Sequence, residues 1–336
     1  MGEEREAEMP NMVNMSNINI KNVFQDCPTL KGSSLDVVWM LSEISGWIQM
    51  FVCIFGIFLI ICCLFLFRNI HLHNLFNQLL LLLSVSHLLF LLSMLFSYLA
   101  KHLEYTILVQ IYPTMLHPIT SITMTLSIYL TMALSVHVYR IIHHPTGRHL
   151  HVLVYFLPAL LLSVCFNIPK CLETTVLDTE DGDVYIDVTE LRVSPAYIKW
   201  YIHWATLLVL GVFPFLVIIS LGCRVLLTVR KTGVQDQNRK HATIFIILVT
   251  FFILSHSFRL ALNMHEMSAV DEIGRCADTD LGGFSVWIIF TGFLSEIALA
   301  INSAATFLFY CLLGPKIKDC VGAVAREETS RRLKWR

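Results

Sequence analysis

Seven stretches of this chain are long and apolar enough to cross a lipid bilayer, and this feature limits the possible folds more than any other. A spanning helix needs about 20 mostly apolar residues, because the hydrocarbon core is about 30 Å thick and each helical residue rises about 1.5 Å. The chain is also poor in charge, with 15% of its 336 residues being Asp, Glu, Lys or Arg. The stretches run over Ser45–Phe67, Phe76–Leu99, Ile107–Val138, Leu150–Ile168, Tyr197–Val229, Ala242–Asn263 and Phe284–Leu312.

These stretches predict an all-α membrane protein built as a seven-transmembrane helix bundle. Its expected parts are an outer tail over 1–44, a membrane domain over 45–312 and a cytoplasmic segment over 313–336. In the last segment Ile317, Val321 and Val324 recur at helical spacing beside basic residues. This spacing predicts a short amphipathic helix on the inner leaflet.

The loop charges predict which side of the membrane each loop occupies. Lys and Arg near helix ends tend to stay in the cytoplasm. The segments after the first, third, fifth and seventh stretches hold fifteen Lys and Arg against four acids, whereas the opposite side holds eight against twenty. We therefore expect the N-terminus outside, where the sequon at Asn14 is available for glycosylation.

Cysteines suggest few covalent constraints. Cys27, Cys171 and Cys276 are the cysteines on the expected outer side. They allow one disulfide at most, and we favour the pair Cys27 and Cys276. Near the inner end, Cys311 and Cys320 are candidates for palmitoylation or are simply small packing residues.

Two charged side chains lie deep inside the predicted spans, Arg259 about two turns from the outer end of the sixth and Glu296 about three turns into the seventh. A charge within the membrane is costly unless it is paired or hydrated, so each is a functional candidate. Their similar depths predict a shared cavity and an ion pair, which a cationic ligand group would displace. An ion pair that only fixes helix packing is the alternative.

Histidine pairs in the loops lack companion ligands at suitable spacing, so neither a metal site nor a cofactor is predicted.

Three segments of the second half carry specific residue patterns. The first joins Asn167–Lys170 to Thr189–Arg192 and then to Tyr197, Tyr201, Trp204 and Pro214. The second runs from Ser255 to Glu266 and the third from Asn302 to Cys311. Together they resemble the rhodopsin-like (class A) G-protein-coupled receptors, and within these the FMRFamide-type neuropeptide receptors of invertebrates.

The resemblance implies two groups of functional residues in the membrane domain. The ligand-binding candidates, which include the two charged residues named above, are Glu296, Arg259, His256, Glu190, Arg192, Tyr201 and Trp204. The candidates for signalling and activation are Tyr310, Thr306, Asn302, His137, Val138, Tyr139, Arg140, His87 and Phe252.

Several positions depart from the pattern of that family. His87 stands where an Asp is expected, Thr306 replaces an Asn, and Phe258 replaces a proline. Val138 occupies the place of the Arg that engages the G protein, and Arg140 follows two residues later. A shift of two residues rotates a side chain by about 200° around an α-helix. Arg140 is therefore expected to face away from the inner cleft.

The leading hypothesis is a plasma-membrane receptor for an extracellular peptide that is amidated and bears Arg near its C-terminus. The receptor would contact membrane lipids and a heterotrimeric G protein, and no nucleic-acid partner is expected. One alternative is a decoy or chemosensory-like receptor with weak coupling, motivated by Val138. Another is a transporter or channel. Enzymatic activity is not expected, because no catalytic motif is present.

Overall fold

A computed structural model describes residues 32–67, 74–102, 115–143, 151–178, 184–231, 236–268 and 286–313. Seven helical segments in these residues are long and apolar enough to span a membrane, which confirms the number of spans predicted from the sequence. The elements are α2 (Gly32–Phe67), α3 (Leu75–His102), α5 (His117–His143), α6 (Leu153–Asn167), η2 (Ile168–Leu172), β1 (Thr174–Asp178), β2 (Val184–Val188), α7 (Glu190–Val193), α8 (Pro195–Tyr197), η3 (Ile198–Val212), α9 (Phe213–Lys231), α10 (Asp236–Ser268) and α12 (Val286–Leu313).

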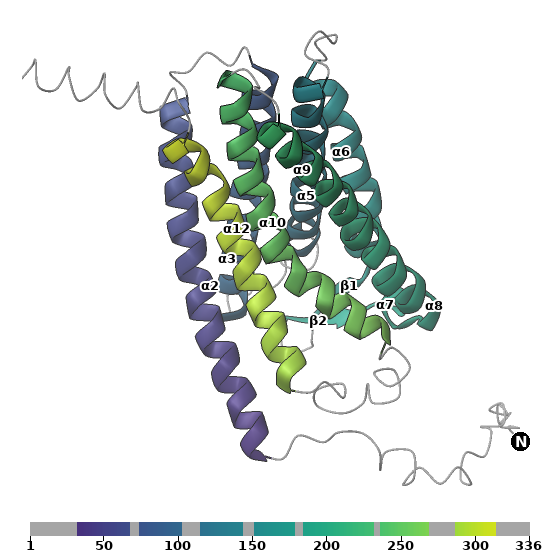
Figure 1. Cartoon of the computed structure of the whole chain (residues 1–336). Coiled ribbons are helices and arrows are strands. Elements are labelled where there is room, and N and C mark those ends of the chain that lie inside the picture. Colours follow the sequence, from purple (N-terminus) through teal and green to yellow (C-terminus); the bar gives the residue numbers. More distant parts are fainter. Residues whose placement is uncertain are drawn as a thin grey trace, which may run out of the picture.

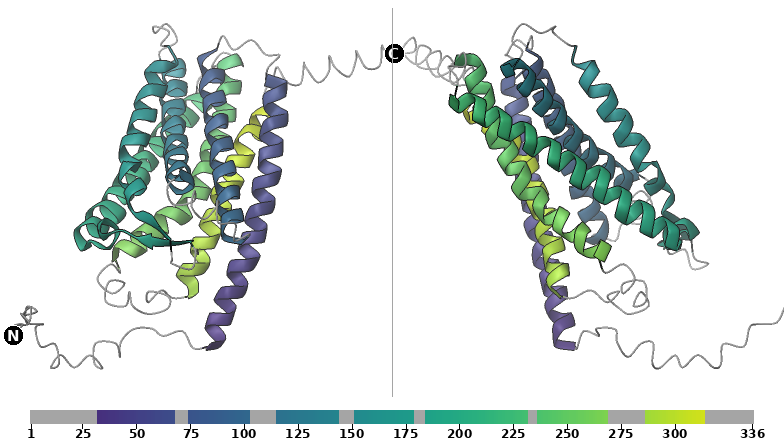
Figure 2. Two further views of the ribbon diagram at one scale, coloured as in Figure 1. Left: turned by 180° about the vertical axis from the view of Figure 1, so that it is seen from behind. Right: turned by 45° about the vertical axis from the view of Figure 1, so that its right-hand side comes forward.

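The long helices form one bundle, and α5 has the most neighbours in it (Figure 1). It packs against α3, α6, α9 and α10, while α12 packs against α2, α10 and α3. The antiparallel hairpin β1–β2 lies across one end of the bundle, where α6 leads into η3 (Figure 2). We refer to this end as the hairpin end.

Some helices extend beyond the apolar stretches that predicted them. α2 begins at Gly32 rather than at Ser45, and α10 covers Asp236–Ser268 rather than Ala242–Asn263. Hydropathy marks the part of a helix that suits lipid, but the backbone ladder continues through polar residues until something breaks it. The added segments contain neither proline nor an internal glycine, so nothing in them ends the helix.

The region from Cys171 to Ala196 links the fourth span to the fifth. Its described part contains the two strands and two short helices. β1 and β2 pair in register from Thr174 opposite Val188 to Asp178 opposite Val184. Val and Thr supply much of this ladder, which is typical of strands. The hairpin therefore gives the hairpin end a paired, regular backbone.

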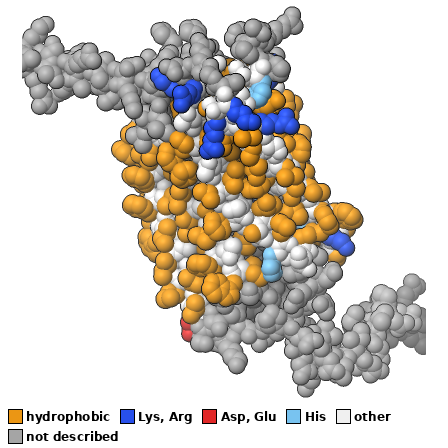
Figure 3. All heavy atoms as spheres, in the orientation of Figure 1, with side chains coloured by type: hydrophobic (Ala, Val, Ile, Leu, Met, Phe, Trp, Pro, Cys, Tyr) orange, Lys and Arg blue, Asp and Glu red, His pale blue; other side chains and the backbone are white. Residues whose placement is uncertain are grey.

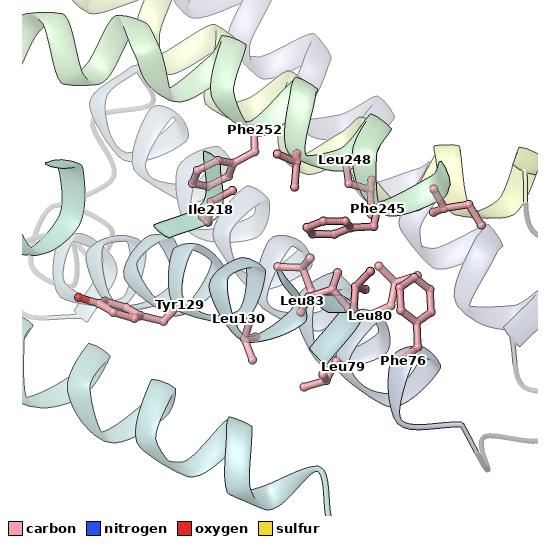
Figure 4. Close-up of a cluster of buried hydrophobic side chains, with 14 of the residues drawn as sticks. Phe76, Leu79, Leu80, Leu83, Tyr129, Leu130, Ile218, Phe245, Leu248 and Phe252 are labelled. Carbon is pink, nitrogen blue, oxygen red and sulfur yellow. The ribbon is translucent and has the colours of Figure 1, made fainter. Parts of the chain in front are cut away.

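Two buried clusters hold the helices together. The larger cluster joins α3, α5, α9 and α10, and Figure 4 shows Phe245, Leu248 and Phe252 of α10 directed toward the helices opposite. The smaller joins α2, α3 and α12 through residues such as Ile60 and Leu91. Dispersion contacts between such side chains, rather than water exclusion alone, drive helix packing in a membrane.

The face of the bundle that Figure 3 shows is largely apolar, and basic side chains gather at one end of it. Large apolar side chains such as Phe51, Phe58 and Trp287 are exposed, as expected for residues that face lipid. The end opposite the hairpin is called the basic end here and is defined by Arg140, Arg224, Arg230, Lys231, Arg239 and Lys240.

Gly56 allows α2 and α12 to approach closely. A Cβ atom at this position would lie 2.8 Å from the Cβ of Ala304 and 2.9 Å from Cδ1 of Leu91. The Ala304 atom is attached directly to the backbone of α12, so it cannot move aside without shifting the helix. A small residue at a helix crossing is a common device in membrane bundles.

We predict that Gly56→Ala lowers the stability of the bundle by about 1–3 kcal/mol, because the added methyl group overpacks this crossing. The measurement is the apparent melting temperature of the purified chain in detergent. Gly292→Ala on α12 is the matched control, since nothing lies within 4 Å of a Cβ added there. Equal melting temperatures for the two variants would contradict the role of Gly56.

Candidate functional site

A cavity opens among α5, η2, η3, α9 and α10, in the half of the bundle nearer the hairpin end. The space between the atoms here is about 550 Å³, and this figure includes space that is open to the surroundings. Its lining combines polar and apolar side chains: Ser121, Met124, Thr125, Lys170, Thr206, Leu210, Gly211, Phe215, Phe252, His256, Arg259, Leu260 and Asn263. A concave site with apolar walls and a few convergent polar groups is the usual form of a ligand site.

The cavity contains two basic side chains from different elements. Lys170 comes from η2, one turn beyond α6, and its Nζ donates a hydrogen bond to Oγ of Ser121 at 3.2 Å. Arg259 comes from α10, and among the described residues it makes neither a hydrogen bond nor an ion pair. The charges that act on Lys170 are those of Arg259, Glu173 and Arg192. The described lining of the cavity includes no carboxylate.

Glu173 ties the hairpin to the start of the fifth span. It is buried, its Oε2 lies 3.5 Å from Nε of Arg192, and its Oε1 accepts a hydrogen bond of 2.9 Å from the hydroxyl of Tyr197. The hydroxyl of Thr189 donates to the carbonyl oxygen of Leu172 at 2.6 Å. Both carboxylate oxygens of Glu173 therefore have partners outside the cavity, and its charge still acts on Lys170.

The end of α6 is fixed by polar contacts to its neighbours. Asn167 is fully buried, and its Nδ2 donates to Oγ1 of Thr125 at 2.9 Å. The hydroxyl of Tyr201 donates to the carbonyl oxygen of Phe166 at 2.6 Å, and the two rings lie 5.4 Å apart. These contacts set the position from which η2 directs Lys170 into the cavity.

The segment η3 is a π-helix, and its geometry shapes one wall of the cavity. The N–H of Phe213 bonds to the carbonyl oxygen of Leu208, five residues back. The next donor in this pattern belongs to residue 214 and would reach Val209, but Pro214 has no N–H. The hydroxyl of Tyr129 on α5 donates to that Val209 carbonyl at 2.8 Å. A side chain thus replaces the backbone donor that proline removes.

Phe252 separates this cavity from a second one nearer the basic end. The second cavity, of about 270 Å³, is lined by residues of α3, α5, α10 and α12, among them Asn302 and Thr306. Phe252 belongs to both linings, and its ring stacks on that of His256 with centroids 4.1 Å apart. A displacement of the Phe252 ring would therefore change the lining of both cavities.

His87 lies at the centre of the bundle between α3 and α12. It is buried and contacts the backbone of Ser303. Its Nδ1 makes no hydrogen bond to a described residue.

At the basic end, the prediction for Arg140 is confirmed. Its Nη1 donates to the hydroxyl of Tyr155 on α6 at 2.9 Å, so the guanidinium points toward a neighbouring helix and not into the cleft. Val138 is 0% exposed and belongs to the larger core cluster. His137 is buried with its ring edge-on to that of Tyr155, and Tyr139 stacks on His143.

The cavity brings together only some of the predicted ligand-binding residues. His256 and Arg259 line it, whereas Arg192 pairs with Glu173 and neither of these two lines it. Tyr201 anchors η3 to α6, Trp204 is exposed on η3, and Glu190 is exposed on α7.

The predicted ion pair between Glu296 and Arg259 is wrong. The described ion pair is that of Arg192 with Glu173, and Glu296 is exposed on α12, which contributes no described residue to the cavity. Similar depth in the membrane did not imply proximity, because the two side chains point from their helices in different directions.

Sequence reasoning also missed Lys170 as a cavity residue, although its place just beyond an apolar stretch was a usable signal.

Other predicted sites lie outside the described residues or side chains. They are the sequon at Asn14, the cysteines Cys27, Cys276 and Cys320, the side chains of Cys311 and Tyr310, and the amphipathic helix after residue 313. Cys171 is described, and its thiol is free and exposed.

The fold and the cavity define a seven-helix membrane receptor, and comparison with known proteins agrees. Residues 48–293, well over half of the chain, match the family model of the 7 transmembrane receptor (rhodopsin family). The chain therefore belongs to this family of G-protein-coupled receptors, and it is not an enzyme. Over 222 residues it is 29% identical to the FMRFamide receptor of Drosophila melanogaster, and the match covers 60% of this chain and 37% of that receptor.

We predict that Tyr129→Phe destabilises the receptor by about 1–3 kcal/mol, because it leaves the Val209 carbonyl without a hydroxyl donor. The apparent melting temperature of the purified chain measures this loss. Pro214→Ala provides the matched test, since alanine supplies the missing N–H. In a double-mutant cycle, Tyr129→Phe should cost less in the Pro214→Ala background. The same cost in both backgrounds would mean that the hydroxyl does not replace the proline N–H.

Proposed function

We propose that this chain is a plasma-membrane receptor for an amidated neuropeptide and transmits binding outside the cell to a heterotrimeric G protein. The observation that carries the proposal is the cavity near the hairpin end, whose floor residue Phe252 also borders the inner cavity. Its membership of the rhodopsin family supports receptor function and gives no support to a transporter or channel. The name of the Drosophila relative supports a peptide ligand of the FMRFamide type.

The proposed orientation places the hairpin end outside the cell and the basic end in the cytoplasm. The basic end gathers Lys and Arg from α5, α9 and α10 (Figure 3). Lys and Arg near the ends of spanning helices are more frequent on the cytoplasmic side of a membrane. The cavity then opens toward the extracellular ligand. The acidic excess in the sequence of the outer segments attracts a ligand that contains Arg.

In this mechanism, a bound ligand changes the relative populations of two bundle arrangements rather than pushing on one rigid structure. η3, α9 and α10 supply most of the lining, so their packing responds directly to what occupies the cavity. Phe252 and His256 transfer the change to the inner cavity beside Asn302 and Thr306. The inner ends of α9 and α10 carry basic residues suited to a G-protein contact.

A second candidate is a receptor that binds its peptide but couples weakly. Val138 favours it, because a fully buried aliphatic side chain stands where a cation is expected, and Arg140 is engaged by Tyr155. Either outcome keeps the same ligand site. The two candidates differ only in what happens at the basic end.

The test is G-protein activation in cells that express the chain at the surface, with a panel of amidated peptides containing Arg. We expect activation by at least one peptide, and a larger maximal response from Val138→Arg. Val138→Leu is the matched control for core disruption. Binding without activation in the unmodified chain, together with activation in Val138→Arg, would favour the weakly coupled receptor. Surface expression with neither binding nor activation in any variant would refute the peptide assignment.

A further inference from the structure

The charge inside the ligand cavity is opposite to that of the predicted outer segments. Lys170 and Arg259 both line it, and no described lining residue is an acid. Arg259 acts electrostatically on Lys170 as a like charge. Two like charges in a site of low dielectric repel one another and lose hydration, so an empty cavity is electrostatically unfavourable.

The acid that acts on Lys170, Glu173, lies outside the cavity lining. Glu173 acts on Lys170 electrostatically, but its two carboxylate oxygens are engaged by Arg192 and Tyr197. Arg192 adds a third positive charge to the surroundings of Lys170. Glu296 does not line the cavity. Among the described residues, Arg259 therefore lacks a counter-ion.

The rest of the lining determines what kind of anion fits. Ser121 positions Lys170 by accepting its hydrogen bond, and Asn263 on α10 adds an amide four residues after Arg259. Leu210, Phe215 and Leu260 cover the remaining wall with apolar surface. A guanidinium presents a planar pair of donors that matches a carboxylate, while an ammonium binds the same group as a point charge.

We propose that the cavity binds a carboxylate of the ligand between Arg259 and Lys170, with an adjoining apolar group against η3 and α10. This inference rests on the proposed peptide-receptor function and names the chemistry of its ligand. An amidated C-terminus carries no charge. The carboxylate is therefore an acidic side chain of the peptide, and basic residues of the same peptide remain at the acidic outer segments.

Binding to the cavity is tested first without a peptide. The probes are 3-phenylpropionate and its neutral analogue 3-phenylpropionamide, and the readout is the ligand-induced rise in melting temperature of the purified full chain in nanodiscs at constant ionic strength. We expect the acid to bind at least about tenfold more tightly than the amide, because charge-assisted hydrogen bonds are the stronger ones. Equal shifts for acid and amide would overturn the proposal.

Variants then assign the effect to the two cations. Arg259→Gln and Lys170→Gln should each remove most of the preference for the acid, while Arg259→Lys should retain part of it. Lys199→Gln is the matched control, since Lys199 is an exposed cation near the same end of the bundle and does not line the cavity. An equal loss in Lys199→Gln would show only a nonspecific response to surface charge and would overturn the assignment.

Peptides distinguish the source of the carboxylate. Amidated peptides that differ only in Glu against Gln should differ in potency at the wild-type receptor by about tenfold or more, and Arg259→Gln should abolish that difference. If instead only peptides with a free C-terminal carboxylate show the dependence on Arg259, the side-chain source is wrong. Should no amidated peptide act while the small-molecule preference persists, the carboxylate site stands and the proposed peptide assignment fails.

Discussion

A bilayer supplies no hydrogen-bonding partners, so the backbone groups of each span must find theirs within the protein. Helices satisfy this requirement along most of the described chain, and hydroxyl side chains follow the same rule by bonding to carbonyls of their own helix, as Ser84 does to Leu80 and Thr131 to Ser127. Pro214 creates a local exception. The hydroxyl of Tyr129 supplies the donor that Val209 would otherwise lack.

The local structure around Pro214 also shapes the cavity. The π-helical turns before Pro214 place Thr206, Leu210 and Gly211 along one wall. Gly211 leaves room for Leu260 of α10, because a Cβ atom there would lie 2.9 Å from Cδ1 of that leucine. Backbone satisfaction, helix approach and cavity shape are thus linked in one short segment. A change that restored ordinary helical geometry would turn these side chains away from the cavity.

The requirement for apolar helices in a bilayer also explains which parts of the structure could be predicted from the sequence. The seven spans follow from apolar length alone, and the rotation of Arg140 follows from counting residues around a helix. Helix ends could not be predicted in this way, since polar residues continue a helix as readily as apolar ones do. α2 and α10 were therefore underestimated.

The cavity was harder to predict because lipid-facing and core-facing surfaces of a membrane helix are both apolar. Phe252, His256 and Arg259 recur at helical spacing, which places them on one face of α10 but does not say what that face contacts. Depth along the helix was the available guide for Glu296, and it carries no information about direction around the helix. Lys170 lies on a turn after α6, where no periodic pattern applies.

In the proposed peptide receptor, charge would act on a ligand at two stages. The acidic excess of the segments placed outside would act on the net charge of an approaching ligand, within the range of about 8 Å that physiological salt allows. Arg259 and Lys170 would act only after the ligand has entered, where water is scarce and each interaction is stronger. A basic peptide with one acidic side chain satisfies both conditions, whereas a purely basic peptide would be attracted to the entrance and repelled from the cavity. Discrimination between such peptides would therefore depend on the cavity, next to Phe252, from which the bundle can respond.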